Sequence, residues 1–413
     1  MLNFYDNHNK AAAILVYLIP FALITGPFLP DLFLCLVGIY FLFISYKHKL
    51  IKYYQNLFVY IFTLFYIYLL VISIFSQEIY PSLHATLFYF RYLFFSLGIW
   101  YLFKNVENFS KNLGISILLA TSIVALDGYY EWIFGYNIFG WTANHATRLS
   151  GFFRDELIIG GYLARLVPLC FALLIYSYPL NKKITIIGLI LLIFYSVIIF
   201  GSGERAAFLF IVMFIFLIIL LSNNFRLYKF LTFIFLILTI VVITIYVPHS
   251  SLKVEETFVN VTHNRLLPFA PYSNLHEEHY IVALRMFVDQ PIFGQGPNMF
   301  PELCHLPQFD FERGCTLHPH NNYIELLSET GIIGVSFLFF AFFIICFLLF
   351  KQFLSFFTNY SKMPDYIIFL LILLFTFTWP LIPTGSFYSN YTNVFYYLPV
   401  GFVLNYFYGH KLK

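Results

Sequence analysis

Apolar runs long enough to cross a membrane alternate with short polar breaks along most of this chain. A helix that spans a bilayer needs about 20 predominantly apolar residues. The pattern predicts twelve spans, at residues 11–26, 28–46, 57–75, 86–103, 112–134, 157–178, 184–201, 205–222, 229–247, 331–350, 366–383 and 393–408. We therefore expect an all-α integral membrane protein with about 12 transmembrane helices and one large, partly helical extracytoplasmic loop.

One long polar segment, residues 248–330, interrupts this pattern and divides the chain into three parts. The first nine predicted spans lie in 1–247, and the last three lie in 331–413. Within the polar segment, apolar residues recur at helical spacing between Asn274 and Gln290. This spacing predicts an amphipathic helix that lies on the membrane surface or packs against the bundle.

The lysines predict the orientation of the chain, because positively charged residues are enriched in cytoplasmic loops. With the N-terminus inside, thirteen of the fourteen lysines fall in cytoplasmic segments, and only Lys253 falls outside. Both termini are therefore expected in the cytoplasm, and residues 248–330 are expected on the outer side of the membrane.

Composition excludes two broad classes of protein. The chain is 61% hydrophobic and only 10% charged, whereas soluble domains are usually about 25% charged. Its net charge of +3 is small and dispersed, which argues against nucleic-acid binding. Two of the five cysteines, Cys304 and Cys315, lie in the polar segment. In an oxidising compartment they either form a disulfide or remain unpaired.

The arginines have the opposite distribution to the lysines. Only Arg226 is expected inside, and the other eight lie outside or near outer helix ends. A guanidinium group binds phosphate through two parallel hydrogen bonds, which an ammonium group cannot do. The set therefore suggests an anionic ligand at the outer membrane boundary, most simply a diphosphate. The candidate residues to bind this anion are Arg148, Arg154, Arg205 and Arg285.

Each arginine also has a structural interpretation, in which it forms an ion pair at a helix end. Glu204 is the nearest carboxylate to Arg205 in sequence, and Asp289 lies one helical turn after Arg285. Arg205 falls in the first turn of a predicted helix, where a cation opposes the helix dipole. The sequence is consistent with both interpretations.

A histidine motif, His318-Pro319-His320-Asn321-Asn322-Tyr323, precedes the tenth predicted span. Asn321 or Asn322 is a suitable N-cap for the helix that begins there. Histidine titrates near neutral pH, so His320 is a candidate general base, with His318 as a second candidate. No third ligand follows at the spacing of a metal site, so we expect neither a metal nor a cofactor.

Two carboxylates, Asp127 and Glu131, lie four residues apart near the outer end of the fifth predicted span. Charged groups at such a position are costly unless they have partners. We expect them to contact the acceptor substrate or to pair with Arg148.

Four motifs together resemble the O-antigen ligase family and its relatives, the O-antigen polymerases and the bacterial protein O-oligosaccharyltransferases. They are Arg148-Leu-Ser-Gly-Phe-Phe, Gly203-Glu-Arg-Ala-Ala, Ala283-Leu-Arg-Met-Phe-Val-Asp-Gln-Pro-Ile-Phe-Gly-Gln-Gly-Pro and His320-Asn-Asn-Tyr-Ile-Glu-Leu-Leu-Ser-Glu-Thr-Gly. The resemblance is most specific over residues 195–345. The doubled asparagine and the additional His318 depart from the family pattern.

The resemblance implies a metal-independent glycosyltransferase of the bacterial inner membrane, with a periplasmic active site. Its donor would be an undecaprenyl diphosphate-linked glycan, and its acceptor a hydroxyl of lipid A-core oligosaccharide or another glycan, as in lipopolysaccharide synthesis. By position, Arg205 and Arg285 would hold the diphosphate and His320 would act at the acceptor, with Arg148, Arg154, His318, Asn321, Asp127 and Glu131 as further substrate contacts. A polymerase, a protein O-oligosaccharyltransferase and a transporter of lipid-linked glycan remain as alternatives, the last disfavoured because the charges gather at the outer face.

Overall fold

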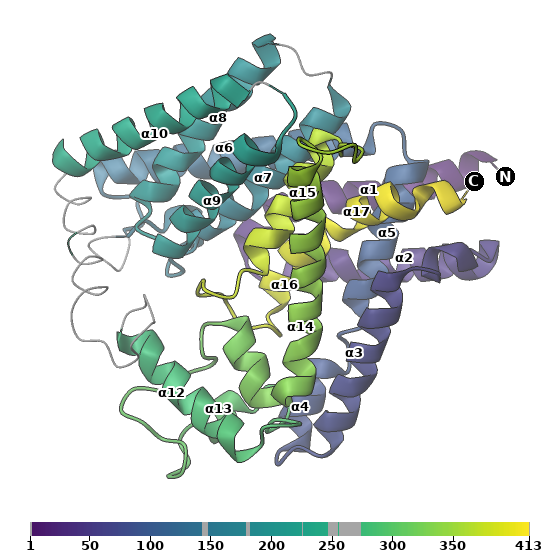
Figure 1. The fold of residues 1–413 in the computed structure, drawn as a ribbon, viewed down its shortest axis with the longest axis vertical. Coiled ribbons are helices and arrows are strands. Elements are labelled where there is room, and N and C mark those ends of the chain that lie inside the picture. The colour runs from purple at the N-terminus through teal and green to yellow at the C-terminus, as the bar shows by residue number, and fades with distance from the viewer. Residues whose placement is uncertain are drawn as a thin grey trace.

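The computed structural model describes residues 2–142, 148–178, 182–224, 226–246, 255 and 274–412. Regular structure within these residues is entirely helical (Figure 1). The first helices are α1 (Leu2–Ala22), α2 (Phe28–His48), α3 (Leu57–Ile74), α4 (Ile79–Thr86), α5 (Arg91–Asn105), α6 (Phe109–Phe134), α7 (Ile159–Ser177), α8 (Lys182–Gly201), α9 (Arg205–Leu221) and α10 (Arg226–Tyr246). The later helices are α12 (Asn274–Asp289), α13 (Phe300–Leu303), α14 (Asn322–Leu354), α15 (Asp365–Phe377), α16 (Asn390–Tyr397) and α17 (Val400–Tyr408).

Nine helices of the described residues are long and apolar enough to cross a membrane, which confirms the predicted fold class. The count differs from the twelve predicted spans. Helices α9 and α15 are apolar but shorter than a full span. The last predicted span, 393–408, is divided between α16 and α17 at Pro399, which directly precedes α17. Proline has no backbone N–H and does not continue the preceding helix.

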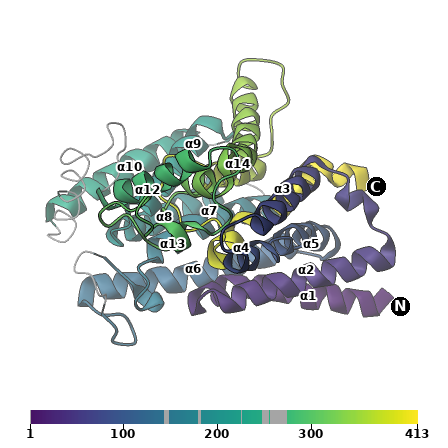
Figure 2. The ribbon, with the colours of Figure 1, turned by 90° about the horizontal axis from the view of Figure 1, so that it is seen from below.

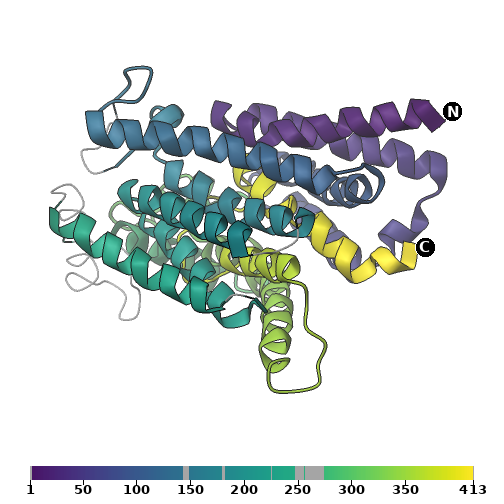
Figure 3. The ribbon, with the colours of Figure 1, turned by 90° about the horizontal axis from the view of Figure 1, so that it is seen from above.

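The helices pack in two groups. Helices α1, α2 and α5 contact one another, and α17 packs against α5. Figures 2 and 3 show α1 and α2 side by side with both chain ends nearby. Helix α7 is central to the second group, because it contacts α6, α8, α9 and α15. It is also the most buried of the candidate spans, with 72% of its apolar window inside the protein.

The polar segment packs against the first turns of α14. Figure 1 shows α12 and α13 beside the same end of α14. Gly331 adopts a left-handed φ of +62° and kinks α14 there. The backbone N–H of Ile332 donates to the carbonyl of Pro291 at 3.0 Å. The Glu329 carboxylate accepts from the backbone N–H of Asn298 at 2.7 Å. These contacts fix the residues that follow α12 against α14 on either side of Gly331.

Candidate functional site

The predicted histidine motif is held rigidly at the start of α14. The side chain of Asn321 accepts hydrogen bonds from the backbone N–H groups of Tyr323 and Ile324, at 2.9 and 3.2 Å. Asn321 is therefore the N-cap, as one of the two sequence alternatives predicted. His320 has a left-handed φ of +56°, and its carbonyl accepts from the backbone N–H of Thr384 at 2.9 Å. Such a conformation is uncommon outside glycine and needs support from surrounding contacts.

Four histidines gather at this point, two from the motif and two from α12. The ring centroids of His318 and His320 are 4.2 Å apart. His276 and His279, one helical turn apart on α12, place their rings 5.3 and 5.5 Å from that of His320. We call His276, His279, His318 and His320 the histidine cluster. The ring of His279 is fixed by its Nδ1, which pairs with the carbonyl of Gly314 at 2.9 Å, so Nδ1 carries the proton.

Burial makes three histidines of the cluster, His276, His318 and His320, neutral at physiological pH. Burial lowers the pKa of His320 to about 4, and the nearby His318 and His279 add to this effect. The pKa values of His276 and His318 are also lowered to about 4, again chiefly by burial. A neutral imidazole has a free lone pair and can accept a proton. The buried Nε2 of His318 has no hydrogen-bond partner within the described residues.

Sequence reasoning missed His276 and His279. Their spacing of three residues places both on one face of α12. That spacing was a usable signal, but only the fold reveals that this face meets the histidine motif.

Arg205 lies at the exposed first turn of α9 and is close enough to His276 to lower the pKa of that imidazole. It forms no ion pair with any residue that the structure describes. The ion-pair interpretation with Glu204 is therefore wrong, because the Glu204 carboxylate is used elsewhere. Its two oxygens accept from the backbone N–H groups of Gly160 and Gly161 at 2.6 and 3.0 Å.

Glu204 thus joins the start of α7 to the start of α9. Burial raises the pKa of Glu204 to about 7, against the opposing effects of Arg148, the two α7 amides and Arg165. Arg148 also donates to the carbonyl of Leu157 at 2.6 Å. Arg165, on α7, donates to the carbonyl of Gly161 at 3.0 Å. Arg148 and Arg165 therefore both lie near the carboxylate of Glu204, the residue that precedes Arg205.

The carboxylates of α6 hold the following loop. Glu131 accepts from the backbone N–H groups of Ser150 and Gly151, at 3.1 and 2.6 Å. Asp127 accepts from the backbone N–H of Ile138 at 2.9 Å. Both side chains are buried, and neither forms an ion pair with Arg148 among the described contacts. The carboxylate beside Arg148 is Glu204 instead.

Arg285 points away from the histidine cluster. It follows His276 by nine residues, which is half a turn away around a helix with 3.6 residues per turn. Its exposed guanidinium donates to the carbonyl of Asp310 and lies 5.1 Å from the ring centroid of Phe311. Its alternative partner, Asp289, accepts instead from the Gln295 side chain at 2.9 Å. The structure therefore does not bring Arg285 together with Arg205 and His320.

A disulfide between Cys304 and Cys315 closes a loop of the polar segment, with a Cα–Cα distance of 5.1 Å. This resolves the sequence alternatives in favour of a bridge. His305 lies beside the two sulfurs. Because both sulfurs are bonded to each other, neither is available as the thiolate ligand that a structural zinc site requires.

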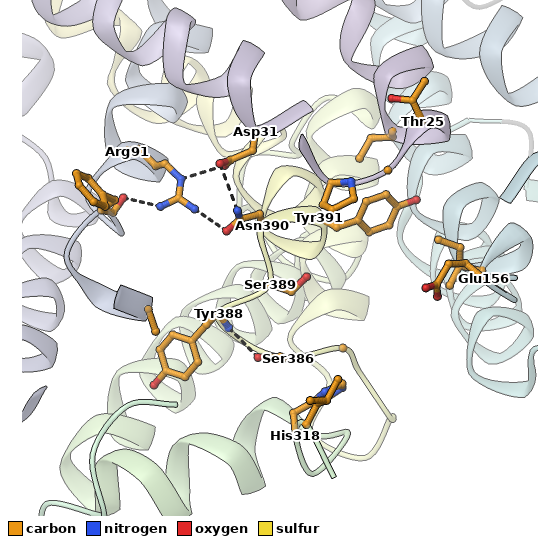
Figure 4. Close-up of a pocket in the computed structure, with 18 of the residues that line it drawn as sticks. Thr25, Asp31, Arg91, Glu156, His318, Ser386, Tyr388, Ser389, Asn390 and Tyr391 are labelled. Carbon is orange, nitrogen blue, oxygen red and sulfur yellow. Dashed lines mark hydrogen bonds and ion pairs between the residues drawn. The ribbon is translucent and has the colours of Figure 1, made fainter. Parts of the chain in front are cut away.

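A cavity of about 1810 Å³ opens beside the histidine cluster. His318 and His320 line one part of it, and Arg154 and Glu156 line another. Arg154 lies 4.3 Å above the ring of Trp141 in a cation–π contact. Figure 4 shows His318, Glu156 and the segment from Ser386 to Tyr391 around the same space. The cavity is thus lined both by the candidate base His320 and by aromatic side chains such as Trp141.

Comparison with known proteins identifies one matching family. Residues 188–339 match the family model described as O-antigen ligase. This stretch contains α9, α12, the disulfide loop and the first half of α14. No curated protein matches the chain.

Proposed function

The chain belongs to the O-antigen ligase family through residues 188–339, and from that premise we propose that it transfers a glycan from a polyprenyl diphosphate carrier to an acceptor hydroxyl. The family makes the chain a membrane glycosyltransferase of the O-antigen ligase and polymerase type. Our proposal adds undecaprenyl diphosphate as the carrier and lipid A-core oligosaccharide as the acceptor. The observation that carries it is the gathering of four histidines at the start of α14, with the start of α9 near enough for the charge of Arg205 to act on His276.

The chemistry requires a base and a stabilised leaving group. The acceptor oxygen attacks the anomeric carbon of the donor while the bond from that carbon to the diphosphate oxygen breaks. His320 takes the proton of the acceptor hydroxyl, because its neutral ring has a lone pair at pH 7. Arg205 forms hydrogen bonds to the departing diphosphate and offsets the negative charge that develops there. The products are the elongated acceptor and the lipid diphosphate.

Arg205 suits this role because its guanidinium group forms no ion pair with the described residues. It is exposed and lies on a rigid helix start whose position Glu204 fixes. Arg285 is less suited, since it already contacts a backbone carbonyl and an aromatic ring on the far side of α12. Within this proposal Arg285 stabilises the loop around Asp310, and Arg154 and Arg148 remain candidate substrate contacts.

The proposal places the site on the periplasmic side of a bacterial inner membrane. Two independent features support this orientation: the near absence of lysine from residues 248–330 and the disulfide within that segment. Disulfides persist in the periplasm and are rare in the reducing cytoplasm. A polymerase or a protein O-oligosaccharyltransferase would use the same donor chemistry and differ only in the acceptor.

The test is transfer by the purified protein in lipid, with an undecaprenyl diphosphate-linked glycan as donor. His320→Ala should lower the rate by ~10²-fold or more, the usual contribution of a general base, while donor binding is retained. Arg205→Ala should weaken donor binding as well as transfer. His305→Ala is the matched control, because His305 is an exposed histidine of the same outer segment outside the cluster. Near-normal transfer by His320→Ala would overturn the proposal.

A further inference from the structure

The cavity beside the histidine cluster has a second polar end, formed by residues that the proposed reaction does not use. There Arg91 of α5 forms an ion pair with Asp31 of α2, with Nε and Oδ1 3.0 Å apart. The Arg91 Nη2 group also donates to the Asn390 side-chain oxygen of α16 at 2.7 Å. The Asn390 amide in turn donates to Asp31 at 3.3 Å. All three residues line the cavity, and Figure 4 shows them as one connected group.

The Asp31–Arg91–Asn390 group offers hydrogen-bond acceptors rather than a free positive charge. Besides its bonds to Asp31 and Asn390, Arg91 donates to the carbonyl of Phe88 and the hydroxyl of Tyr92, at 2.8 and 2.7 Å. Its charge is balanced by Asp31, and most of its five N–H groups are engaged. Each Asp31 oxygen accepts one of these bonds and has a further lone pair for a ligand. The Asn390 oxygen accepts from both Arg91 and Tyr92, but its amide nitrogen has a second N–H that can donate to a ligand.

The charges along the cavity point to the same kind of ligand. Its described lining contains three carboxylates, on Asp31, Glu156 and Glu302, and two guanidinium groups, on Arg91 and Arg154. A wall with this balance does not attract an anion. It is suited to a ligand that is polar but uncharged, because a few placed polar groups on an otherwise apolar lining fix its orientation.

The segment from Thr384 to Asn390 connects this polar end to the candidate base. Thr384 is bonded to the His320 carbonyl, and the Ser386 hydroxyl donates to Glu325 of α14 at 2.6 Å. In the view of Figure 4, Ser386 and Ser389 lie between His318 and the Asp31–Arg91–Asn390 group. Six residues span at most about 20 Å of extended chain, so both ends are within reach of one short oligosaccharide.

We propose that the Asp31–Arg91–Asn390 group is a binding subsite for an uncharged sugar ring. Hydroxyl hydrogens of the sugar bond to the oxygens of Asp31, and the second amide N–H of Asn390 donates to a sugar hydroxyl oxygen, while a neighbouring part of the glycan lies at His320. The inference rests on the proposed glycosyl transfer. The ring belongs either to the acceptor glycan or to the glycan of the donor, and these two sources share the same chemistry.

The test compares initial rates of Asn390→Ala and the wild-type protein in lipid, with each substrate varied while the other is saturating. Asn390→Ala removes the amide but leaves the Arg91–Asp31 ion pair in place. Asn105→Ala, an exposed asparagine at the other end of α5, is the matched control. The subsite predicts about a tenfold rise in KM for one substrate with kcat retained, which corresponds to one lost polar contact. Asp31→Asn should raise KM for the same substrate.

The substrate whose KM rises identifies the source of the sugar. The fold-change caused by Asn390→Ala should be the same at about 50 mM and about 500 mM salt, because salt screens only charged interactions. A fold-change that collapses at high salt would show an anionic ligand and overturn the inference. Unchanged KM values for both substrates would also overturn it, as would a fall in kcat and thermal stability with unchanged KM. Activity of His320→Ala is a separate readout, which decides the proposed function alone.

Discussion

The Glu204 carboxylate accepts a hydrogen bond from the backbone N–H of Gly160 at 2.6 Å, and so connects two helix starts that are 44 residues apart in sequence. The first N–H groups of a helix have no partner within the helix, and a carboxylate there also meets a favourable helix dipole. Glu204 directly precedes Arg205 in α9. The contact therefore sets where the start of α9 presents that arginine.

The Glu204–Gly160 contact predicts that Gly160 cannot be enlarged. A Cβ at position 160 would collide with the Ser202 hydroxyl and lie 3.0 Å from Glu204 Oε1. We expect Gly160→Ala to cost about 1–3 kcal/mol, as overpacking does in other cores. It should also weaken donor binding by moving Arg205. Thermal unfolding in detergent and donor affinity are the measurements.

Gly188→Ala on α8 is the control, because a Cβ at Gly188 meets no atom within 4 Å. Alanine is also the better helix former there, so Gly188→Ala should be neutral or stabilising. Equal stability of the two alanine variants would show that the Glu204–Gly160 contact does not constrain the fold.

The histidine cluster predicts an unusual dependence of transfer on pH. The pKa values of His276, His318 and His320 are lowered to about 4, so these side chains are neutral in the folded protein down to about pH 5. The rate should therefore stay constant between about pH 6 and pH 8 and fall only as pH approaches 4. A profile that falls with an apparent pKa near 6.5, the ordinary value for histidine, would contradict a buried neutral base.

The same three histidines should also make the free energy of unfolding depend on pH. In the unfolded chain their pKa values return to about 6.5, so the unfolded state binds more protons than the folded state between about pH 4 and pH 6.5. The contribution of these three histidines to stability is complete above about pH 6.5 and is lost as pH falls towards 4. His276→Gln should reduce this acid sensitivity, measured as the change in Tm between pH 7 and pH 5.

Local features of the site were accessible from sequence, because each depends on neighbouring residues. The apolar spacing within 274–290 predicted α12, which is observed at Asn274–Asp289. The Asn321 cap depends on the three residues that follow it. The disulfide was one of two alternatives for the only cysteines of the polar segment.

Contacts between distant segments were not accessible in the same way. Nothing near Glu204 in sequence indicates that its carboxylate bonds to Gly160 rather than to the adjacent Arg205. The segment that follows Thr384 was interpreted as a short break between two spans, although it lines the cavity and contacts His320. The orientation of Arg285, by contrast, could be predicted from sequence, because helix geometry alone places it on the face opposite His276.

The disulfide predicts how many cysteines react with a thiol reagent before and after reduction. Cys304 and Cys315 are bridged, while Cys35, Cys170 and Cys346 are free thiols. Denatured but unreduced protein should therefore take up three maleimide labels, and reduction should raise the number to five. Five labels without reductant would contradict the bridge. Loss of the bridge by Cys304→Ser should cost up to ~3 kcal/mol through loop-closure entropy.

Arg205 and Arg285 should respond differently to substitution, although the sequence motifs predicted the same role for both. Arg205→Lys should raise KM for the donor about tenfold or more, because a single ammonium cannot reproduce the two parallel hydrogen bonds of a guanidinium to a phosphate. Arg285→Lys should change that KM little, since Arg285 contacts the Asp310 carbonyl and the Phe311 ring on the far side of α12. Initial rates at varied donor concentration measure both effects, with Tm as a check on folding. If Arg285→Lys weakens donor binding as strongly as Arg205→Lys at unchanged Tm, Arg285 reaches the donor, and α12 must then rotate when the donor binds.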